Sequence, residues 1–250
     1  MKANSMKDKN FIDNVPDLSS PAYKIRKEAR SLPLYECRIS TGWETVKLAN
    51  LSVARQHPDG SITVTFYLVD LMCFGIKETE YLYDVALAEY LERLEKVKEF
   101  MDMEVTDYSV IHNIIYAGIA WGEKFGFNPA NEFTFVTQFN LEEDRDDIEI
   151  MDIECGDENG KPVYLVGPFE SEEEVQLITS RLEQNAGIGN FSVIRSVYKV
   201  EEFDEMEEDT MDNHVTLLNL DFIRTEIFRN PDLNIDEIIE KNIDSKDRFN

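Results

Sequence analysis

One alternating segment, 62–69, restricts the fold of this 250-residue chain more than any other feature. Every second side chain from Ile62 to Leu68 is aliphatic or aromatic, and this period of two is typical of a β-strand with one face against an apolar core. The Asp59–Gly60 pair just before the segment is a strong hairpin signal. We therefore predict an antiparallel hairpin whose other strand covers 47–56.

Helices are predicted where a capping residue precedes a segment whose apolar residues recur about every 3.6 residues. Ser20 precedes Pro21 at the start of a basic helix, Asp84 can cap another, and Ser171 with Glu174 forms a capping box. Gly126 is a plausible stop for the helix before it. The predicted helices cover 22–31, 85–103, 107–125, 171–185, 215–228 and 235–243.

Further strands are predicted from short apolar runs that lie between turn residues. They cover 34–39, 133–139, 148–154, 163–166 and 191–200. The turn at 157–160 ends in Asn159–Gly160, which favours hairpin geometry and predicts pairing of 148–154 with 163–166.

Hairpins and helices that mix without a regular strand–helix–strand rhythm indicate an α+β fold. We expect a mixed or antiparallel sheet with β-hairpins packed against several helices, plus a helical C-terminal extension. The expected organisation is a flexible tail over 1–20, one globular domain over 21–200, and an acidic linker with its helical extension over 201–250.

The formal net charge is −26, and it is concentrated in two zones. Residues 140–175 hold fourteen acids and two bases (−12), and residues 201–250 hold sixteen and five (−11). A main surface for nucleic acid or for anionic membrane needs basic charge, so direct nucleic-acid and membrane binding are not expected. Hydrophobic residues make up 42% of the chain, which is too much for a disordered acidic protein.

Compartment is inferred from the cysteines and from the absence of an apolar run near 18 residues. Cys37, Cys73 and Cys155 are widely spaced and odd in number, so they predict reduced thiols in a cytoplasmic protein rather than a disulfide framework.

Candidate chemistry begins where the alternating strand ends, at 70–77. Asp70, Cys73 and Lys77 place a carboxylate, a thiol and an amine on what is predicted to be a loop. A nearby cation would lower the pKa of the thiol and make it a nucleophile. The alternative is that Cys73 is a buried filler, Lys77 lies on the surface and Asp70 shapes the turn.

A second candidate set lies on the predicted helix over 107–125. At 100° per residue, His112, Tyr116 and Glu123 fall on one polar line opposite the apolar face. If that line faced the 70–77 loop, a Cys73–His112 pair oriented by a carboxylate would be conceivable, and Tyr116 with Glu123 offers an acid–base pair. The alternative is an amphipathic helix with a solvent-exposed polar stripe.

Cofactor and metal motifs are missing from the sequence. It contains no GxGxxG, no GxxxxGK[ST] and no HExxH, and its three histidines are far apart. The turn at 157–161 lacks the ligand spacing of a calcium loop. We therefore expect no cofactor and no metal.

Two segments carry a family resemblance. The 68–77 segment (LVDLMCFGIK) resembles a segment of uncharacterised bacterial proteins, and 112–129 (HNIIYAGIAWGEKFGFNP) is similar to a second one in the same proteins. The stretch from Gly160 to Pro168 fits as well. The resemblance covers about 34–195 and implies that this range is one unit and 201–250 an extension. That family has no assigned activity, so the resemblance implies no reaction.

Three classes of function remain open from the sequence. The first is a non-enzymatic interaction or regulatory module, because the predicted helix over 215–228 is apolar around most of its circumference and needs a protein partner or self-association. The second is a hydrolase or transferase built from the six candidate residues. The third is an acidic inhibitor that imitates nucleic acid, which the uneven distribution of charge makes less favourable.

Overall fold

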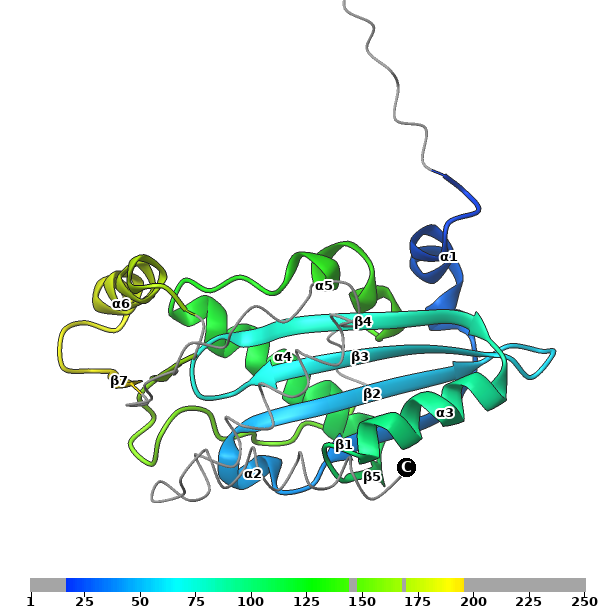
Figure 1. Cartoon of the computed structure of the whole chain (residues 1–250), viewed down its shortest axis with the longest axis horizontal. Coiled ribbons are helices and arrows are strands. Elements are labelled where there is room, and N and C mark those ends of the chain that lie inside the picture. Colours follow the sequence, from blue (N-terminus) through cyan, green and yellow to red (C-terminus); the bar gives the residue numbers. More distant parts are fainter. Residues whose placement is uncertain (1–16, 144–147, 168–169, 196–250) are drawn as a thin grey trace, which may run out of the picture.

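The computed structural model describes residues 17–143, 148–167 and 170–195. Its centre is a five-stranded antiparallel sheet in the order β4-β3-β2-β1-β5 (Figure 1), which confirms the α+β class. The predicted N-terminal tail, the linker and the two C-terminal helices fall mostly or wholly outside the described residues, so those domain boundaries stay predictions. The strands are β1 (Leu34–Ser40), β2 (Leu48–Gln56), β3 (Ile62–Asp70), β4 (Gly75–Val85) and β5 (Met103–Thr106).

The β2–β3 hairpin confirms the opening prediction. Gln56 pairs with Ile62, and the turn between them is closed by the Gly60 N–H, which donates to the His57 carbonyl at 2.9 Å. Gly60 has φ +92°, a conformation that glycine adopts without steric cost. The alternation then places successive β3 side chains on opposite faces of the sheet.

Each face of the sheet is covered by a different helix. Helix α4 (Tyr108–Lys124) lies behind the sheet in Figure 1, where Ile111, Ile114 and Ile115 join the largest apolar cluster with the odd-numbered residues of β2 and β3. Helix α3 (Leu87–Lys98) lies in front, and its Tyr90 and Leu94 cover the first half of β3. The second half of β3 lies beyond the α3 cluster on that face.

The helix predicted over 85–103 starts later than expected. Strand β4 continues to Val85, and α3 begins at Leu87 after Ala86. Asp84 does not cap a helix; it lies within β4 with φ +54°, and its backbone N–H donates to the Thr63 hydroxyl. Strand β4 was therefore missed. The helix also ends earlier than predicted, at Lys98, and Met103 begins strand β5, which was missed as well.

The segment predicted as a strand over 133–139 is instead helical. It forms α5 (Asn131–Phe135) and the 3-10 helix η2 (Thr137–Asn140). Phe133 and Val136, three residues apart, are buried while Phe135 is 59% exposed, so its apolar residues follow a helical and not a two-residue period. Helix α1 (Pro21–Glu28) packs against η2 and is capped by Ser20 as predicted, and η1 (Ala29–Ser31) follows it.

The second predicted hairpin is wrong. Strand β6 (Val163–Val166) pairs parallel with β7 (Ser192–Arg195), and α6 (Glu172–Asn185) connects them, with its capping box formed as predicted. The turn does form, since the Gly160 N–H donates to the Asp157 carbonyl. The segment before it bonds elsewhere: the Gly156 N–H donates to the Leu71 carbonyl, and 149–155 is not a strand. A short helix, α2 (Trp43–Val46), completes the described elements.

Close packing of α4 on the β3–β4 turn supplies a first prediction. A Cβ on Gly122 would lie 2.5 Å from the Phe74 carbonyl oxygen, and a backbone atom cannot easily move away. Gly122→Ala should therefore lower the free energy of unfolding by about 1–3 kcal/mol, even though alanine is the better helix former. Urea denaturation measures this, with Ala120→Ser on the exposed side of α4 as the matched control. Equal or greater stability of Gly122→Ala would contradict the tight contact.

Candidate functional site

The 70–77 segment is a tight turn and not an open loop. Strand β3 ends at Asp70, whose carboxylate accepts the backbone N–H groups of Met72 at 2.8 Å and Cys73 at 3.0 Å. Strand β4 begins at Gly75, so Lys77 lies within it. Its ammonium lies 5.8 Å from the centre of the Phe74 ring. Asp70 therefore shapes the turn, as the alternative interpretation of this segment expects.

Cys73 has no exposed surface and belongs to an apolar cluster with Phe125, Phe127 and Tyr164. Burial raises the pKa of its thiol far above the ordinary value, and the nearby Asp70 carboxylate raises it further. Lys77 lowers the pKa but does not offset these effects. The side chain is therefore a neutral thiol at physiological pH.

Native Cys73 should resist alkylation. Because the thiolate is the reactive species and the sulfur is inaccessible, iodoacetamide should modify Cys73 at least about a hundredfold more slowly in the folded chain than in urea. Mass spectrometry of the alkylated peptides measures the rates, and Cys155, which is partly exposed with a pKa raised to about 11, is the internal comparison. Rapid alkylation of native Cys73 would restore it as a candidate nucleophile.

His112 and Tyr116 lie on α4, but they do not form a solvent-exposed stripe. His112 is 2% exposed, and its Nε2 lies 3.3 Å from the Glu142 carbonyl oxygen. The Tyr116 hydroxyl donates to the same oxygen at 3.0 Å, and the two rings are 4.4 Å apart. The polar line on the helix therefore holds the 140–143 segment against α4. Glu123, in the last turn, is exposed.

The structure does not bring Cys73 and His112 together. The turn that carries Cys73 contacts α4 at Gly122, close to Trp121 and Phe125. His112 lies ten residues earlier on that helix, which is about 15 Å along its axis. Of the six candidates, Asp70 and Cys73 meet in the turn, and His112 and Tyr116 meet at Glu142.

A buried ionic network was missed by the sequence interpretation. The Arg55 side chain is only 5% exposed and donates to both carboxylate oxygens of Glu142, at 3.0 and 3.1 Å. It also donates to the Asn140 carbonyl at 3.0 Å and to the Leu32 carbonyl at 2.8 Å. Arg55 continues the two-residue period of Leu51 and Val53, which face the core, and an arginine at such a position is the signal that could have indicated the network.

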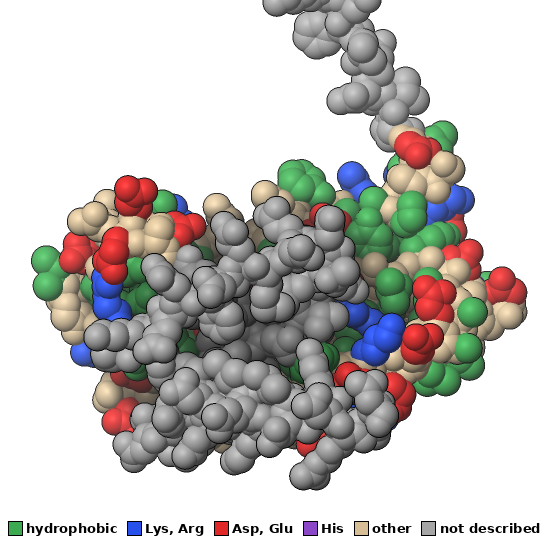
Figure 2. Space-filling view, viewed as in Figure 1, with side chains coloured by type: hydrophobic (Ala, Val, Ile, Leu, Met, Phe, Trp, Pro, Cys, Tyr) green, Lys and Arg blue, Asp and Glu red, His purple; other side chains and the backbone are tan. Residues whose placement is uncertain are grey.

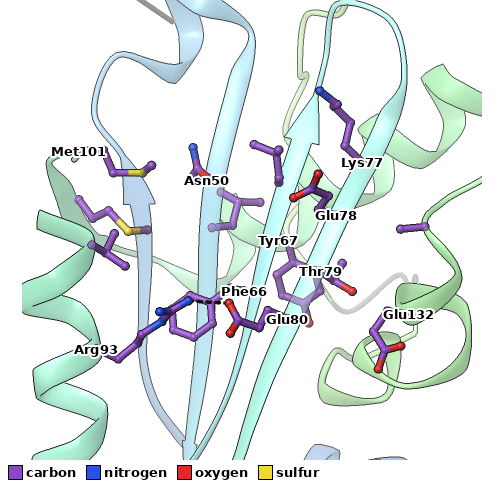
Figure 3. A pocket seen from close by; sticks show the side chains of 15 residues that line it. Asn50, Phe66, Tyr67, Lys77, Glu78, Thr79, Glu80, Arg93, Met101 and Glu132 are labelled. Carbon is purple, nitrogen blue, oxygen red and sulfur yellow. Dashed lines mark hydrogen bonds and ion pairs between the residues drawn. The ribbon is translucent and has the colours of Figure 1, made fainter. Parts of the chain in front are cut away.

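An apolar-lined concavity lies on the α3 side of the sheet (Figure 3). This cavity of about 400 Å³ is bounded below by side chains of β2, β3 and β4 and on one side by α3 and the segment that leads into β5. We call it the sheet groove. Its apolar lining includes Phe66, Leu68, Val97, Met101 and Met103, with Asn50 and Glu78 among its polar residues.

One ion pair crosses the groove. Arg93 reaches from α3 over the Phe66 ring to Glu80 on β4, where its Nη2 donates at 2.7 Å (Figure 3). A second cavity, of about 730 Å³, continues along α3 and β4 as far as Leu82 and shares this pair. Glu132 lines both cavities on the far side of β4. The two cavities therefore form one elongated depression with an apolar and a more polar part.

Comparisons with protein-family models, with curated proteins and with solved structures find no match. The resemblance of 68–77 and 112–129 to uncharacterised bacterial proteins thus gains no family assignment, and the sheet groove and the buried network are the features that bear on function.

Two further findings concern the described residues alone. No helix there has the length and apolar character needed to cross a bilayer. No group of three or more metal-ligating side chains occurs within the described ranges either.

Proposed function

We propose that this protein is a non-enzymatic protein-interaction module and that its sheet groove receives an apolar, helical segment of a protein. The observation that carries the proposal is the apolar lining of a concave sheet face by Phe66, Leu68, Val97, Met101 and Met103. Methionine pairs at such a surface adapt to differently shaped partners. Helix-in-groove binding uses this combination of an apolar floor and a polar rim.

The dimensions of the depression suit one helix. Its floor crosses β2, β3 and β4, and two strand spacings amount to about 10 Å, close to the diameter of a helix. Along β4 the two cavities extend from Lys77 to Leu82, which is about 17 Å. A helix of three turns fills that length.

The same geometry makes the enzyme hypothesis less favourable. A buried thiol of raised pKa and an imidazole held against a backbone carbonyl do not make Cys73 and His112 a paired nucleophile and base. The inhibitor that imitates nucleic acid is also weakly supported. On the face shown in Figure 2, acidic and basic side chains are interspersed over α3 and α6, whereas rows of carboxylates would be needed.

A titration with a defined peptide tests the proposal. The probe is a designed helix of leucine and glutamine with an apolar stripe and no net charge, added to the full chain labelled with ¹³C at its methionine methyls. We expect saturable shifts of the Met101 and Met103 signals, while Met72 and Met151, which do not line the groove, stay unchanged. If an excess of the peptide shifts neither the Met101 nor the Met103 signal, the proposal is contradicted.

A further inference from the structure

We propose that, in the isolated chain, the sheet groove is occupied by the chain's own residues 215–228, which a protein partner has to displace. This inference rests on the proposed function of the groove and adds its regulation. Residues 215–228 lie outside the described residues, but their sequence and their distance along the chain both suit the groove.

The segment matches the groove in composition and length. Eight of its fourteen residues are apolar, and Asp221, Arg224 and Glu226 give it a net charge of only −1. The sequence predicts a helix here, and fourteen helical residues extend about 21 Å, close to the span of the depression along β4. An apolar stripe at Leu217, Leu220, Ile223 and Ile227 faces the floor in this arrangement.

The described chain ends within reach of the groove. Arg195 is the last residue of β7, which pairs with β6, and the Val163 N–H at the start of β6 donates to the Met72 carbonyl in the β3–β4 turn. Leu68, at the near end of the groove, lies four residues before Met72, or about 13 Å along the strand. Twenty residue steps separate Arg195 from Val215 and can span up to roughly 65 Å, so the segment can reach the groove of its own chain.

Occupation by the same chain has a consequence for partners. A partner then binds only the fraction of molecules in which the groove is open, and its apparent affinity falls by that fraction. A segment that fills the groove nine-tenths of the time weakens binding about tenfold.

The test uses the full chain with ¹³C-labelled methionine methyls. In the variant Leu217→Asp/Leu220→Asp/Ile223→Asp, which puts three acids on the stripe that faces the floor, the Met101 and Met103 signals should move. The matched control, Asn219→Asp/Thr225→Asp, adds acids at polar positions and should leave them in place. Unchanged Met72 and Met151 signals show that each variant is folded.

A peptide of residues 215–228 completes the test. It should return the Met101 and Met103 signals of the responsive variant to their wild-type positions, and it should bind that variant about tenfold more tightly than the wild-type chain. The inference is overturned if the Leu217→Asp/Leu220→Asp/Ile223→Asp variant does not move the two signals, or if the wild-type signals depend on protein concentration, which indicates occupation by a second copy. If substitutions in 215–228 and the 215–228 peptide leave the Met101 and Met103 signals unchanged, but the neutral leucine–glutamine helix shifts them, only this inference fails. If they respond to no helix, the proposed function fails with it.

Discussion

Arg55→Met is expected to lower the free energy of unfolding by about 3–5 kcal/mol, the largest stability effect we predict for one substitution. The guanidinium is 5% exposed, and methionine would leave the Asn140 and Leu32 carbonyls without its hydrogen bonds. Each unsatisfied buried carbonyl costs about 1–3 kcal/mol, and the anchor of the Glu142 carboxylate is lost as well. Urea denaturation at neutral pH measures the change.

Arg195→Met is the matched control, because Arg195 pairs with Glu172 where both side chains are more than half exposed. Exposed pairs contribute little, so this variant should keep the wild-type midpoint. A loss below about 1 kcal/mol in Arg55→Met would show that the network does not hold the 140–143 segment on the sheet.

Glu142 gives the same network a pH dependence. Burial raises the pKa of its carboxyl, but the hydrogen bond from Tyr108 and the charge of Arg55 outweigh burial and lower it overall. Because the pKa is lower in the folded state, the ionised Glu142 carboxylate stabilises the fold at pH values above 4.5, its ordinary pKa. This stabilisation is lost as the pH falls through the lowered pKa of the folded state. Glu142→Gln should therefore lose less stability on acidification than the wild type, by a modest margin because the carboxylate is one-third exposed.

Local signals explain which elements could be predicted from the sequence. The β2–β3 hairpin follows from alternation and one turn, and α4 and α6 follow from helical period and caps, all of which depend on neighbours in sequence. The parallel pairing of β6 with β7 could not be predicted. It depends on the hydrogen bonds of Gly156 and Val163 to the distant 71–72 turn, which remove the hairpin that Asn159–Gly160 would otherwise favour.

Strand β4 and the groove were missed for one physical reason. On the α3 side of the sheet β4 presents Glu78 and Glu80, opposite Leu68 and Phe66 of β3. These acids border a cavity instead of packing into a closed core, so the strand lacks the apolar alternation that made β3 predictable. The six candidate residues were chosen for reactive chemistry, and only Lys77 among them lines the groove. A binding surface built from ordinary apolar side chains gives no motif to search for.

The largest effect on binding is expected from Met101→Glu/Met103→Glu, made in the full chain that also carries Leu217→Asp/Leu220→Asp/Ile223→Asp so that its own segment does not compete. Both methionines are half-buried and line the groove. Losing their apolar contacts and setting two carboxylates against an apolar helix should weaken the neutral leucine–glutamine peptide about 30-fold, or roughly 2 kcal/mol. Fluorescence anisotropy of the labelled peptide measures the dissociation constants.

Val105→Glu separates a contact effect from a general effect of added acid. Val105 lies on β5 two residues after Met103, on the same face of the sheet, but it is 62% exposed and does not line the groove. Because the peptide is neutral, an added carboxylate outside the groove should change its affinity less than twofold. Equal weakening by Val105→Glu would locate binding elsewhere on this face. An unchanged dissociation constant in the methionine variant would mean that the peptide does not bind in the groove. The functional surface of the protein would then lie elsewhere.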